Sequence, residues 1–318
     1  MTPRTGSVPE LVQQARAGQA RAVARLISLV EGGSPLVRQV AELVSPDTGR
    51  AQVVGITGSP GVGKSTSTAA LVGELRRRGR RVGVLAVDPT SLFSGGALLG
   101  DRVRMAEHAT DPEVFIRSMA TRGHLGGLAW ATPLALRVLE TAGCEVILVE
   151  TVGVGQSEVE VAALADTTLV LLSPGMGDGI QAAKAGILEV GDVYVVNKAD
   201  RDGAQQVRRE LRSMLSLAER PAGAWRPPVL MTVAVEGDGL DEVADQVAAH
   251  LEWASGSGEL ARRRVRRARA EVEAIALTEL RRRFEHLPGG DRLDALADAV
   301  VRGERDPFAA ADALLDNL

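Results

Sequence analysis

The sequence predicts an α/β fold: a mostly parallel sheet flanked by helices. From residue 53 to about 253, short apolar segments alternate with segments of helical periodicity, as in strands joined by crossover helices. Several apolar segments are continuous, such as 146–149 and 169–172, which is typical of strands buried on both faces. A glycine-rich loop of the form G-x-x-x-x-G-K-S follows the first strand and opens a helix. Together these observations predict a P-loop nucleoside-triphosphatase domain.

Seven strands are expected in this domain, with helical patterns between them. In sheets of this kind, ligands bind at the carboxyl ends of the strands. The polar residues at those ends are therefore the first candidates for a functional site. The candidate strands are residues 53–57, 82–87, 114–117, 145–150, 168–173, 193–197 and 229–234.

Helical segments are expected on both sides of this domain. Apolar residues recur at helical spacing from 9 to 44 and are interrupted at Gly32-Gly33-Ser34-Pro35, which predicts two helices. After Gly256-Ser257-Gly258, a linker, residues 259–284 are expected to form a long helix, and 291–302 and 307–317 two short ones. The predicted division is an N-terminal helical segment (1–48), a P-loop GTPase domain (49–254) and a C-terminal helical arm for dimerisation or docking (255–318).

The long C-terminal helix contains arginine runs at 262–267 and 281–283. Charge runs of this kind usually cover a solvated helix face, and we expect that here. The apolar positions of the same helix could still pack on a partner.

Composition excludes several classes of protein. The 318 residues carry a net charge of −4 with a pI near 5.7, which argues against a nucleic-acid partner, and only 3% are aromatic. The single cysteine, Cys144, excludes an internal disulfide framework and is expected to be a buried thiol in a reducing compartment. No apolar run approaches a membrane span, and no signal-peptide pattern opens the chain, so a cytoplasmic protein without a membrane partner is expected.

The P-loop residues predict a phosphate site. Backbone N–H groups of the loop and the N-terminus of the next helix favour bound anions. Lys64 would reach the terminal phosphates, and the Ser65 hydroxyl would ligate Mg²⁺. The candidate residues are Gly58, Ser59, Pro60, Gly61, Val62, Gly63, Lys64, Ser65 and Thr66.

A second motif predicts the base. Asn197-Lys198-Ala199-Asp200 follows the strand residues Val193 to Val196 and has the form N-K-x-D. The Asp200 carboxylate could accept hydrogen bonds from both N1–H and the exocyclic amine of guanine, a donor pair that adenine lacks. GTP is therefore favoured over ATP, with Asn197, Lys198 and Asp200 as the guanine-binding residues.

Acidic residues at neighbouring strand ends predict the catalytic metal site. Glu150 ends the strand 145–150, where the Mg²⁺-binding carboxylate of such domains lies, and Gly153 could donate its N–H to the γ-phosphate. Asp88 and Asp101 fall on the same rim as candidate ligands of Mg²⁺ or of the attacking water. Together with Lys64, these acids are the candidate catalytic residues.

Several segments give the chain a more specific resemblance. From about Gly49 to Asp200 it resembles the MeaB/ArgK family, the GTPases associated with methylmalonyl-CoA mutase, and the flanking helices extend the resemblance over nearly the whole chain. The segments that carry it are 55–66, Val87-Asp88-Pro89-Thr90-Ser91, 95–105, 114–123, Glu150-Thr151-Val152-Gly153-Val154-Gly155-Gln156-Ser157-Glu158 and 196–200.

The resemblance implies a GTP-hydrolysing chaperone of an adenosylcobalamin-dependent acyl-CoA mutase, which gates cofactor delivery from an adenosyltransferase and protects or reactivates the mutase. It also implies a homodimer, GTP/GDP and Mg²⁺ as cofactors, and a base loop at Val233, Ala234 and Val235. A mutase-signalling loop is implied at 174–184, with Asp178, Gln181 and Lys184 as its residues. Two positions depart from the family pattern: Gly179 replaces an acidic residue, and Val233-Ala234 replaces Ser-Ala.

Three other functions remain open at this stage. A nickel metallochaperone GTPase would need paired Cys and His ligands, whereas this chain has one cysteine and four scattered histidines. An ArgK-like transport-associated ATPase or kinase would use ATP, against which the N-K-x-D motif argues. A non-hydrolysing module would bind GTP without turnover.

Overall fold

The computed structural model describes residues 6–89, 108–121, 131–151, 157–175, 190–285 and 291–315. It divides the chain into two compact units, Met1–Arg267 (unit 1) and Ala268–Leu318 (unit 2). This division falls inside a helix, whereas the sequence analysis places the start of the arm at residue 255. Over the described ranges, no helix combines the length and apolar character that crossing a membrane requires.

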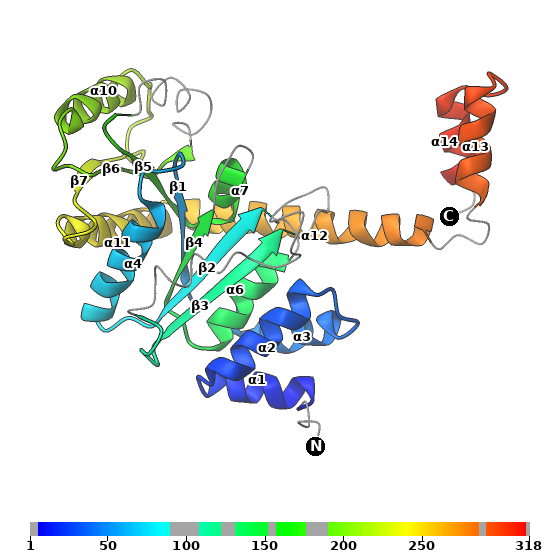
Figure 1. Ribbon diagram of the computed structural model, residues 1–318, viewed down its shortest axis with the longest axis horizontal. Helices are drawn as coiled ribbons and strands as arrows, with labels where there is room; N and C mark the ends of the chain where they lie inside the picture. The colour runs from blue at the N-terminus through cyan, green and yellow to red at the C-terminus, as the bar shows by residue number, and fades with distance from the viewer. Residues whose placement is uncertain are drawn as a thin grey trace. The chain divides into compact units, whose positions relative to one another are not determined.

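A seven-stranded parallel sheet forms the centre of unit 1, in the order β3-β2-β4-β1-β5-β6-β7 (Figure 1). The predicted fold class is confirmed, and every pairing in the sheet is parallel. The strands are β1 Gln52–Thr57, β2 Val82–Pro89, β3 Val114–Thr121, β4 Val146–Thr151, β5 Thr167–Leu172, β6 Val193–Asn197 and β7 Val229–Thr232.

Helices cover both faces of the sheet because its central strands are apolar on both sides. α4 (Lys64–Arg77) and α11 (Leu240–Gly256) pack on one face, around Val54, Ile56 and Leu148. The other face packs against α6 (Ala131–Thr141), α7 (Ser157–Leu164), α10 (Ala204–Ser216) and the N-terminal helices. This arrangement holds the carboxyl ends of β1, β4 and β6 at a single edge, where the P-loop lies.

Three N-terminal helices precede β1, not the two predicted: α1 (Val8–Arg16), α2 (Ala20–Glu31) and α3 (Val37–Val44), followed by a short 3₁₀ turn, Ser45–Asp47. The additional break is at Gly18, whose φ of 75° ends α1, with Gln19 N–H donating to Gln14 C=O. Hydrophobic periodicity continues across this tight turn, so the sequence pattern alone did not reveal it. In Figure 1 these helices lie beside α6.

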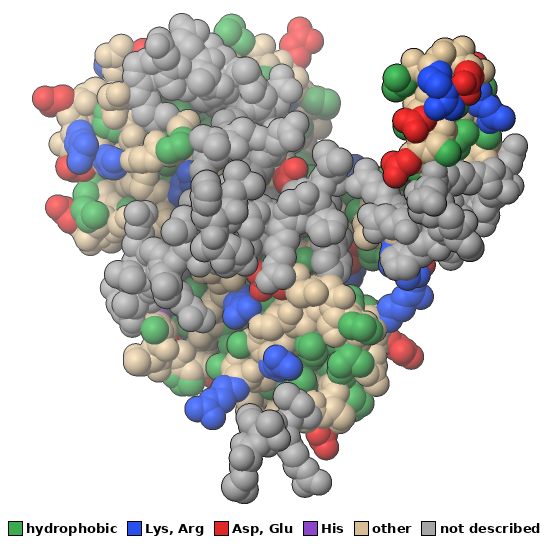
Figure 2. Space-filling model, turned by 45° about the vertical axis from the view of Figure 1, so that its right-hand side comes forward, with side chains coloured by type: hydrophobic (Ala, Val, Ile, Leu, Met, Phe, Trp, Pro, Cys, Tyr) green, Lys and Arg blue, Asp and Glu red, His purple; other side chains and the backbone are tan. Residues whose placement is uncertain are grey.

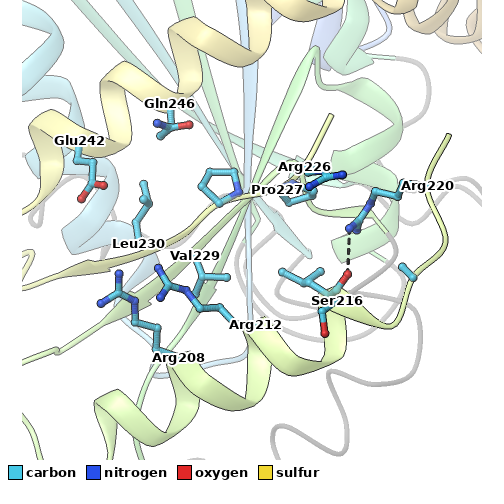
Figure 3. A pocket seen from close by; sticks show the side chains of 13 residues that line it. Arg208, Arg212, Ser216, Arg220, Arg226, Pro227, Val229, Leu230, Glu242 and Gln246 are labelled. Atoms are coloured by element: carbon cyan, nitrogen blue, oxygen red, sulfur yellow. Dashed lines mark hydrogen bonds between the residues drawn. The ribbon is translucent and has the colours of Figure 1, made fainter. Parts of the chain in front are cut away.

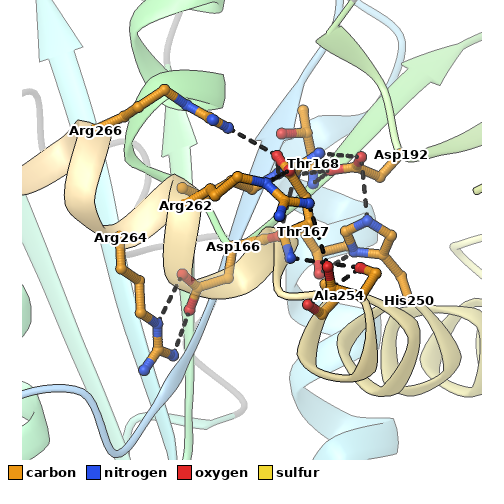
Figure 4. A network of polar contacts seen from close by, with 12 residues as sticks. Asp166, Thr167, Thr168, Asp192, His250, Ala254, Arg262, Arg264 and Arg266 are labelled. Atoms are coloured by element: carbon orange, nitrogen blue, oxygen red, sulfur yellow. Dashed lines mark hydrogen bonds and ion pairs between the residues drawn. The ribbon is translucent and has the colours of Figure 1, made fainter. Parts of the chain in front are cut away.

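The arginine run 262–267 is partly buried, which corrects the expectation of a solvated face. It lies in α12 (Glu259–Glu285), which is separated from the end of α11 by two residues. Arg263 donates to both oxygens of Asp192, at 2.6 and 2.8 Å. Arg264 donates to both oxygens of Asp166, at 3.3 and 2.9 Å (Figure 4). Because the two aspartates directly precede β6 and β5, these ion pairs fasten the start of α12 to the amino end of the sheet.

The aspartates in these ion pairs are also bonded to the sheet itself. Asp166 accepts a hydrogen bond from the backbone N–H of Val53, and Asp192 accepts one from that of Thr168. Burial opposes the charged form of Asp192, but His250, with Nε2 3.2 Å from Oδ1, and Arg263 outweigh it and lower the pKa of the carboxyl. The network therefore keeps a buried carboxylate ionised next to the arginines of α12.

Unit 2 contains the rest of α12, α13 (Asp291–Val301) and α14 (Pro307–Leu315), near the residues predicted. Its helices leave large apolar side chains exposed. Figure 2 shows apolar side chains among acidic and basic ones on the α13–α14 pair. The exposed apolar residues of the unit include Val272, Ile275, Leu277, Leu280, Leu293, Val301, Phe308 and Leu315.

Candidate nucleotide-binding site

The loop between β1 and α4 has the conformation that its glycines allow. Gly63, with φ of 96°, precedes the first residue of α4. A Cβ atom added to Gly63 would lie 2.5 Å from Nδ2 of Asn197, so no other residue fits without displacing that amide. The last glycine of the P-loop is therefore required by its contact with the N-K-x-D motif as well as by its backbone angle.

Lys64 lies within the P-loop. Its side chain is buried, and Nζ donates a 2.6 Å hydrogen bond to the carbonyl oxygen of Gly58 and a 3.4 Å bond to that of Ser59. The ammonium group is thus held at the N-terminus of α4, a helix of 14 residues whose dipole also favours an anion. Charge and backbone donors are concentrated where a phosphate chain would bind.

Ser65 and Glu150 bring α4 and β4 together beside this loop. The Ser65 hydroxyl donates a 2.5 Å hydrogen bond to Oε1 of Glu150, and both residues are buried. The register of the sheet produces this contact, because Ile56 of β1 pairs with Glu150 of β4 directly before the P-loop. A hydroxyl and a carboxylate are the oxygen donors that Mg²⁺ takes in phosphate sites, so the pair fits that ion.

Asn197 connects three segments of the site. Its Nδ2 donates to the carbonyl oxygen of Val62 at 2.9 Å, while its Oδ1 accepts from Thr232 Oγ1 and from the backbone N–H of Ala234, at 3.2 and 3.1 Å. The side chain is 3% exposed. One amide thus joins the P-loop, the end of β7 and the predicted base loop.

Lys198 extends this connection. Its φ of 58° makes it the one residue other than glycine with a positive φ among the described ranges, and its Nζ donates a 2.7 Å bond to the carbonyl oxygen of Gly61. Non-glycine residues in this region carry backbone strain, which is concentrated at functional sites. The backbone N–H of Ala199 donates to Thr232 C=O, which leaves the Asp200 side chain exposed at the rim.

The base loop closes on itself after β7. The backbone N–H of Val233 donates to Asp238 C=O at 3.1 Å, and that of Gly237 donates to Val233 C=O. Ala234 is buried by its bond to Asn197, while Val235 is 80% exposed. The loop is therefore joined to the N-K-x-D motif through Ala234, while Val235 is left in solvent.

Comparison with known proteins decides the family. The model of the family "Methylmalonyl Co-A mutase-associated GTPase MeaB" matches residues 23–288. This chain belongs to the MeaB family. It is accordingly a P-loop GTPase, in agreement with the fold and with the site geometry.

Relatives and a solved structure extend over nearly the whole chain. A Pyrococcus abyssi protein is 46% identical over 314 residues, covering 98% of this chain and 97% of its own. The mouse "Methylmalonic aciduria type A homolog, mitochondrial" is 35% identical over 319 residues, covering 94% of this chain and 76% of its own. The crystal structure of an LAO/AO transport system kinase superposes with a TM-score of 0.72 at 28% identity and covers 99% of both chains.

Among the site residues expected for this MeaB member, the structure brings together Lys64, Ser65, Glu150, Asn197 and Lys198. Asp88 lies in β2, but its side chain is outside the described residues. Also outside them are Asp101, Gly153, Asp178, Gly179, Gln181 and Lys184.

Thr232 is a site residue that the sequence analysis missed. Its hydroxyl donates to Asn197 Oδ1 and its carbonyl accepts from Ala199. The available signal was its position directly before the base loop that begins at Val233. Within the described ranges, no three His, Cys, Asp or Glu side chains gather in a group that could hold a metal ion.

Proposed function

We propose that this MeaB-family GTPase is a chaperone of an adenosylcobalamin-dependent acyl-CoA mutase, which gates cofactor loading and protects or reactivates the mutase. Family membership supports the association with a mutase, since the family is named for methylmalonyl-CoA mutase. The name of the mouse relative points to the same metabolism. An adenosyltransferase is the corresponding donor of the cofactor.

The observation that carries the GTPase part of the proposal is the contact between the P-loop and the N-K-x-D motif through Asn197. Guanine would be read by Asp200, with Lys198 and Val233 to Val235 around the base. Phosphates would bind the N–H groups of residues 58–66 and the Lys64 ammonium, which would stabilise negative charge developing on the terminal phosphate during hydrolysis.

Ser65 and Glu150 would hold Mg²⁺, and Asp88 and Asp101 complete the proposed set of acidic residues. Bound there, the ion would neutralise charge on the phosphate oxygens. Glutamate at position 150 reaches the Ser65 hydroxyl directly, at 2.5 Å. We propose that Gly153 donates to the γ-phosphate, and that the segment containing Asp178, Gln181 and Lys184 transmits the nucleotide state to the mutase.

We also propose a homodimer that uses the C-terminal arm. The exposed apolar side chains of unit 2 support it, because a second copy would remove them from water. Four of them, Val272, Ile275, Leu277 and Leu280, lie on α12.

The test is GTP hydrolysis by the protein alone and with a purified adenosylcobalamin mutase from the same organism. We expect hydrolysis to rise at least about tenfold with the mutase, and the Lys64→Ala variant to show no rise. GTP turnover that stays unchanged at saturating mutase would overturn the chaperone proposal and leave the GTPase assignment intact.

A transport-associated kinase or ATPase is the second candidate, favoured by the name of the structure that superposes at a TM-score of 0.72. It differs from the first in its nucleotide. Competition between GTP and ATP decides between them: ATP that displaces labelled GDP as well as GTP does would favour the kinase.

A further inference from the structure

A cavity of about 540 Å³ lies between α10, β7 and α11 in unit 1 (Figure 3). Its floor includes Val229 and Leu230, at the amino end of β7, whereas the nucleotide site lies beyond Thr232 at the carboxyl end. The cavity is therefore separate from the P-loop. Its volume is within the range of small-molecule sites.

Four arginines line this cavity, against one carboxylate. Arg208 and Arg212 extend from α10, and Arg220 and Arg226 come from the segment that leads to β7. Glu242 lies on the opposite wall, on α11 (Figure 3). Throughout the described part of the chain, no carboxylate forms an ion pair with any of the four arginines.

Of the four cavity arginines only Arg208 is partly buried, and three other partly buried arginines of this chain are paired with carboxylates. Arg117 forms an ion pair with Glu31, as do Arg263 with Asp192 and Arg264 with Asp166. The chain thus supplies carboxylates where it buries guanidinium groups for structural reasons. Arg208 is different, because it is partly buried, has no ion pair in the described structure and lies in one cavity lining with three exposed arginines.

Arg208 shows most clearly that, among the described residues, the guanidinium groups of this cavity lack acidic partners. Its Nε is buried with no hydrogen-bond partner in the described structure, and its Nη1 donates to the sulfur of Met231 at 3.7 Å. A thioether is a weak acceptor, so the guanidinium is held in place without a strong one. A phosphate oxygen would give the terminal Nη nitrogens a much stronger acceptor than a thioether.

The other walls of the cavity are apolar or neutral. Leu215, Pro227 and Pro228 lie next to the arginines, and Ser216 and Gln246 supply hydrogen-bonding groups. The ligand should therefore combine a strongly anionic group with an uncharged organic part.

We propose that this cavity binds a small organic phosphate. Guanidinium groups bind phosphate oxygens bidentately, and a phosphate dianion can bind two arginines from different directions. A carboxylate, with two oxygens, forms one such bidentate pair. Arg208 and Arg212, which lie one turn apart on the helix, would hold the phosphate, and Arg226 adds positive charge to the same lining. Glu242 then accepts hydrogen bonds from hydroxyl groups of the organic part.

Calorimetry with phenyl phosphate and inorganic phosphate tests the proposal, on protein saturated with GDP and Mg²⁺ so that the P-loop is filled. We expect both probes to bind, with phenyl phosphate several-fold tighter because its ring packs on the apolar wall. We expect Arg208→Ala/Arg212→Ala to weaken both by about tenfold or more. Arg209→Ala is the matched control: it lies on the same helix but not in the cavity lining, and should bind both probes as the wild type does.

Three results would overturn the proposal: neither probe binds at millimolar concentration, the double variant binds as tightly as wild type, or phenyl phosphate binds no better than inorganic phosphate. Arg212→Glu provides a second variant, because the residue is exposed and its replacement leaves the core unchanged. Its charge reversal should abolish binding while GDP affinity is unaffected. Unchanged binding in this variant would also count against the site.

Discussion

The Ser65 hydroxyl on α4 donates a 2.5 Å hydrogen bond to Oε1 of Glu150 at the end of β4. This contact joins the P-loop helix to the strand expected to carry the metal-binding acid. Both residues are buried, so neither side chain is free to move independently of the sheet. It provides the most direct route to test the proposed Mg²⁺ site.

Glu150→Gln should raise the Mg²⁺ concentration for half-maximal GTP hydrolysis by about 10- to 100-fold. Glutamine keeps the acceptor oxygen for Ser65 but removes the charge that the ion requires. Titrating Mg²⁺ against hydrolysis measures this shift. Glu145→Gln, a change just before the start of the same strand, is the control; an unchanged Mg²⁺ requirement for Glu150→Gln would exclude Glu150 as a ligand.

Asp200→Asn should weaken GTP binding by about 10- to 100-fold without creating ATP binding. The amide loses the charged acceptor for the two guanine donors, yet gains nothing that would specifically recognise adenine. Because the Asp200 side chain is exposed, folding should be unaffected. Calorimetry with GTP and ATP is the measurement, and Asp202→Asn, two residues further along, should bind GTP normally.

Arg264→Ala should lower the free energy of unfolding by about 1–3 kcal/mol. Asp166, buried before β5, would lose one of the two arginines that neutralise it, Arg264, and keep the more distant Arg267 at 3.5 Å. Denaturant unfolding of this variant and the wild type measures the difference in the free energy of unfolding. Arg266→Ala, an exposed neighbour on α12, should cost less than about 0.5 kcal/mol, and equal losses would contradict the role of the buried ion pair.

Cys144 should resist thiol reagents in the native protein. It is 2% exposed, and burial raises the pKa of its thiol to about 12, so the reactive thiolate is scarce at pH 8 and remains scarce at pH 9. The reaction of Cys144 with a chromogenic disulfide reagent should be at least about 100-fold slower than that of a free thiol. The reaction should go to completion once guanidinium chloride unfolds the chain. Rapid native labelling at pH 8 would show that Cys144 is accessible. Its burial agrees with the sequence analysis.

The sheet and the nucleotide motifs could be predicted because each has a local sequence pattern. Strand periodicity, the glycines of the P-loop and the N-K-x-D motif occur in contiguous segments, and parallel pairing brings their ends to the same edge. The sequence analysis named Ser65 and Glu150 as candidate ligands of Mg²⁺, and the structure brings the two side chains into contact. Fold class and family were accordingly confirmed.

The contacts between distant segments could not be predicted in this way. Periodicity identifies 262–267 as arginine-rich but does not indicate that Asp166 and Asp192 lie buried ahead of two strands. Thr232 was missed for the same reason, since its bond to Asn197 spans 35 positions in the sequence. The third N-terminal helix was missed because Gly18 turns the chain without disturbing the hydrophobic pattern.

Asn197 limits how the base preference of this GTPase could be redesigned. A replacement at that position would release Val62 in the P-loop and Ala234 in the base loop at once, so the phosphate and base sites would lose their geometry together. Gly63 faces the same amide and tolerates no side chain. A second substitution at Gly63 therefore cannot compensate for a change at Asn197. A protein engineer who seeks another nucleobase should leave both residues unchanged and vary Asp200 at the exposed rim.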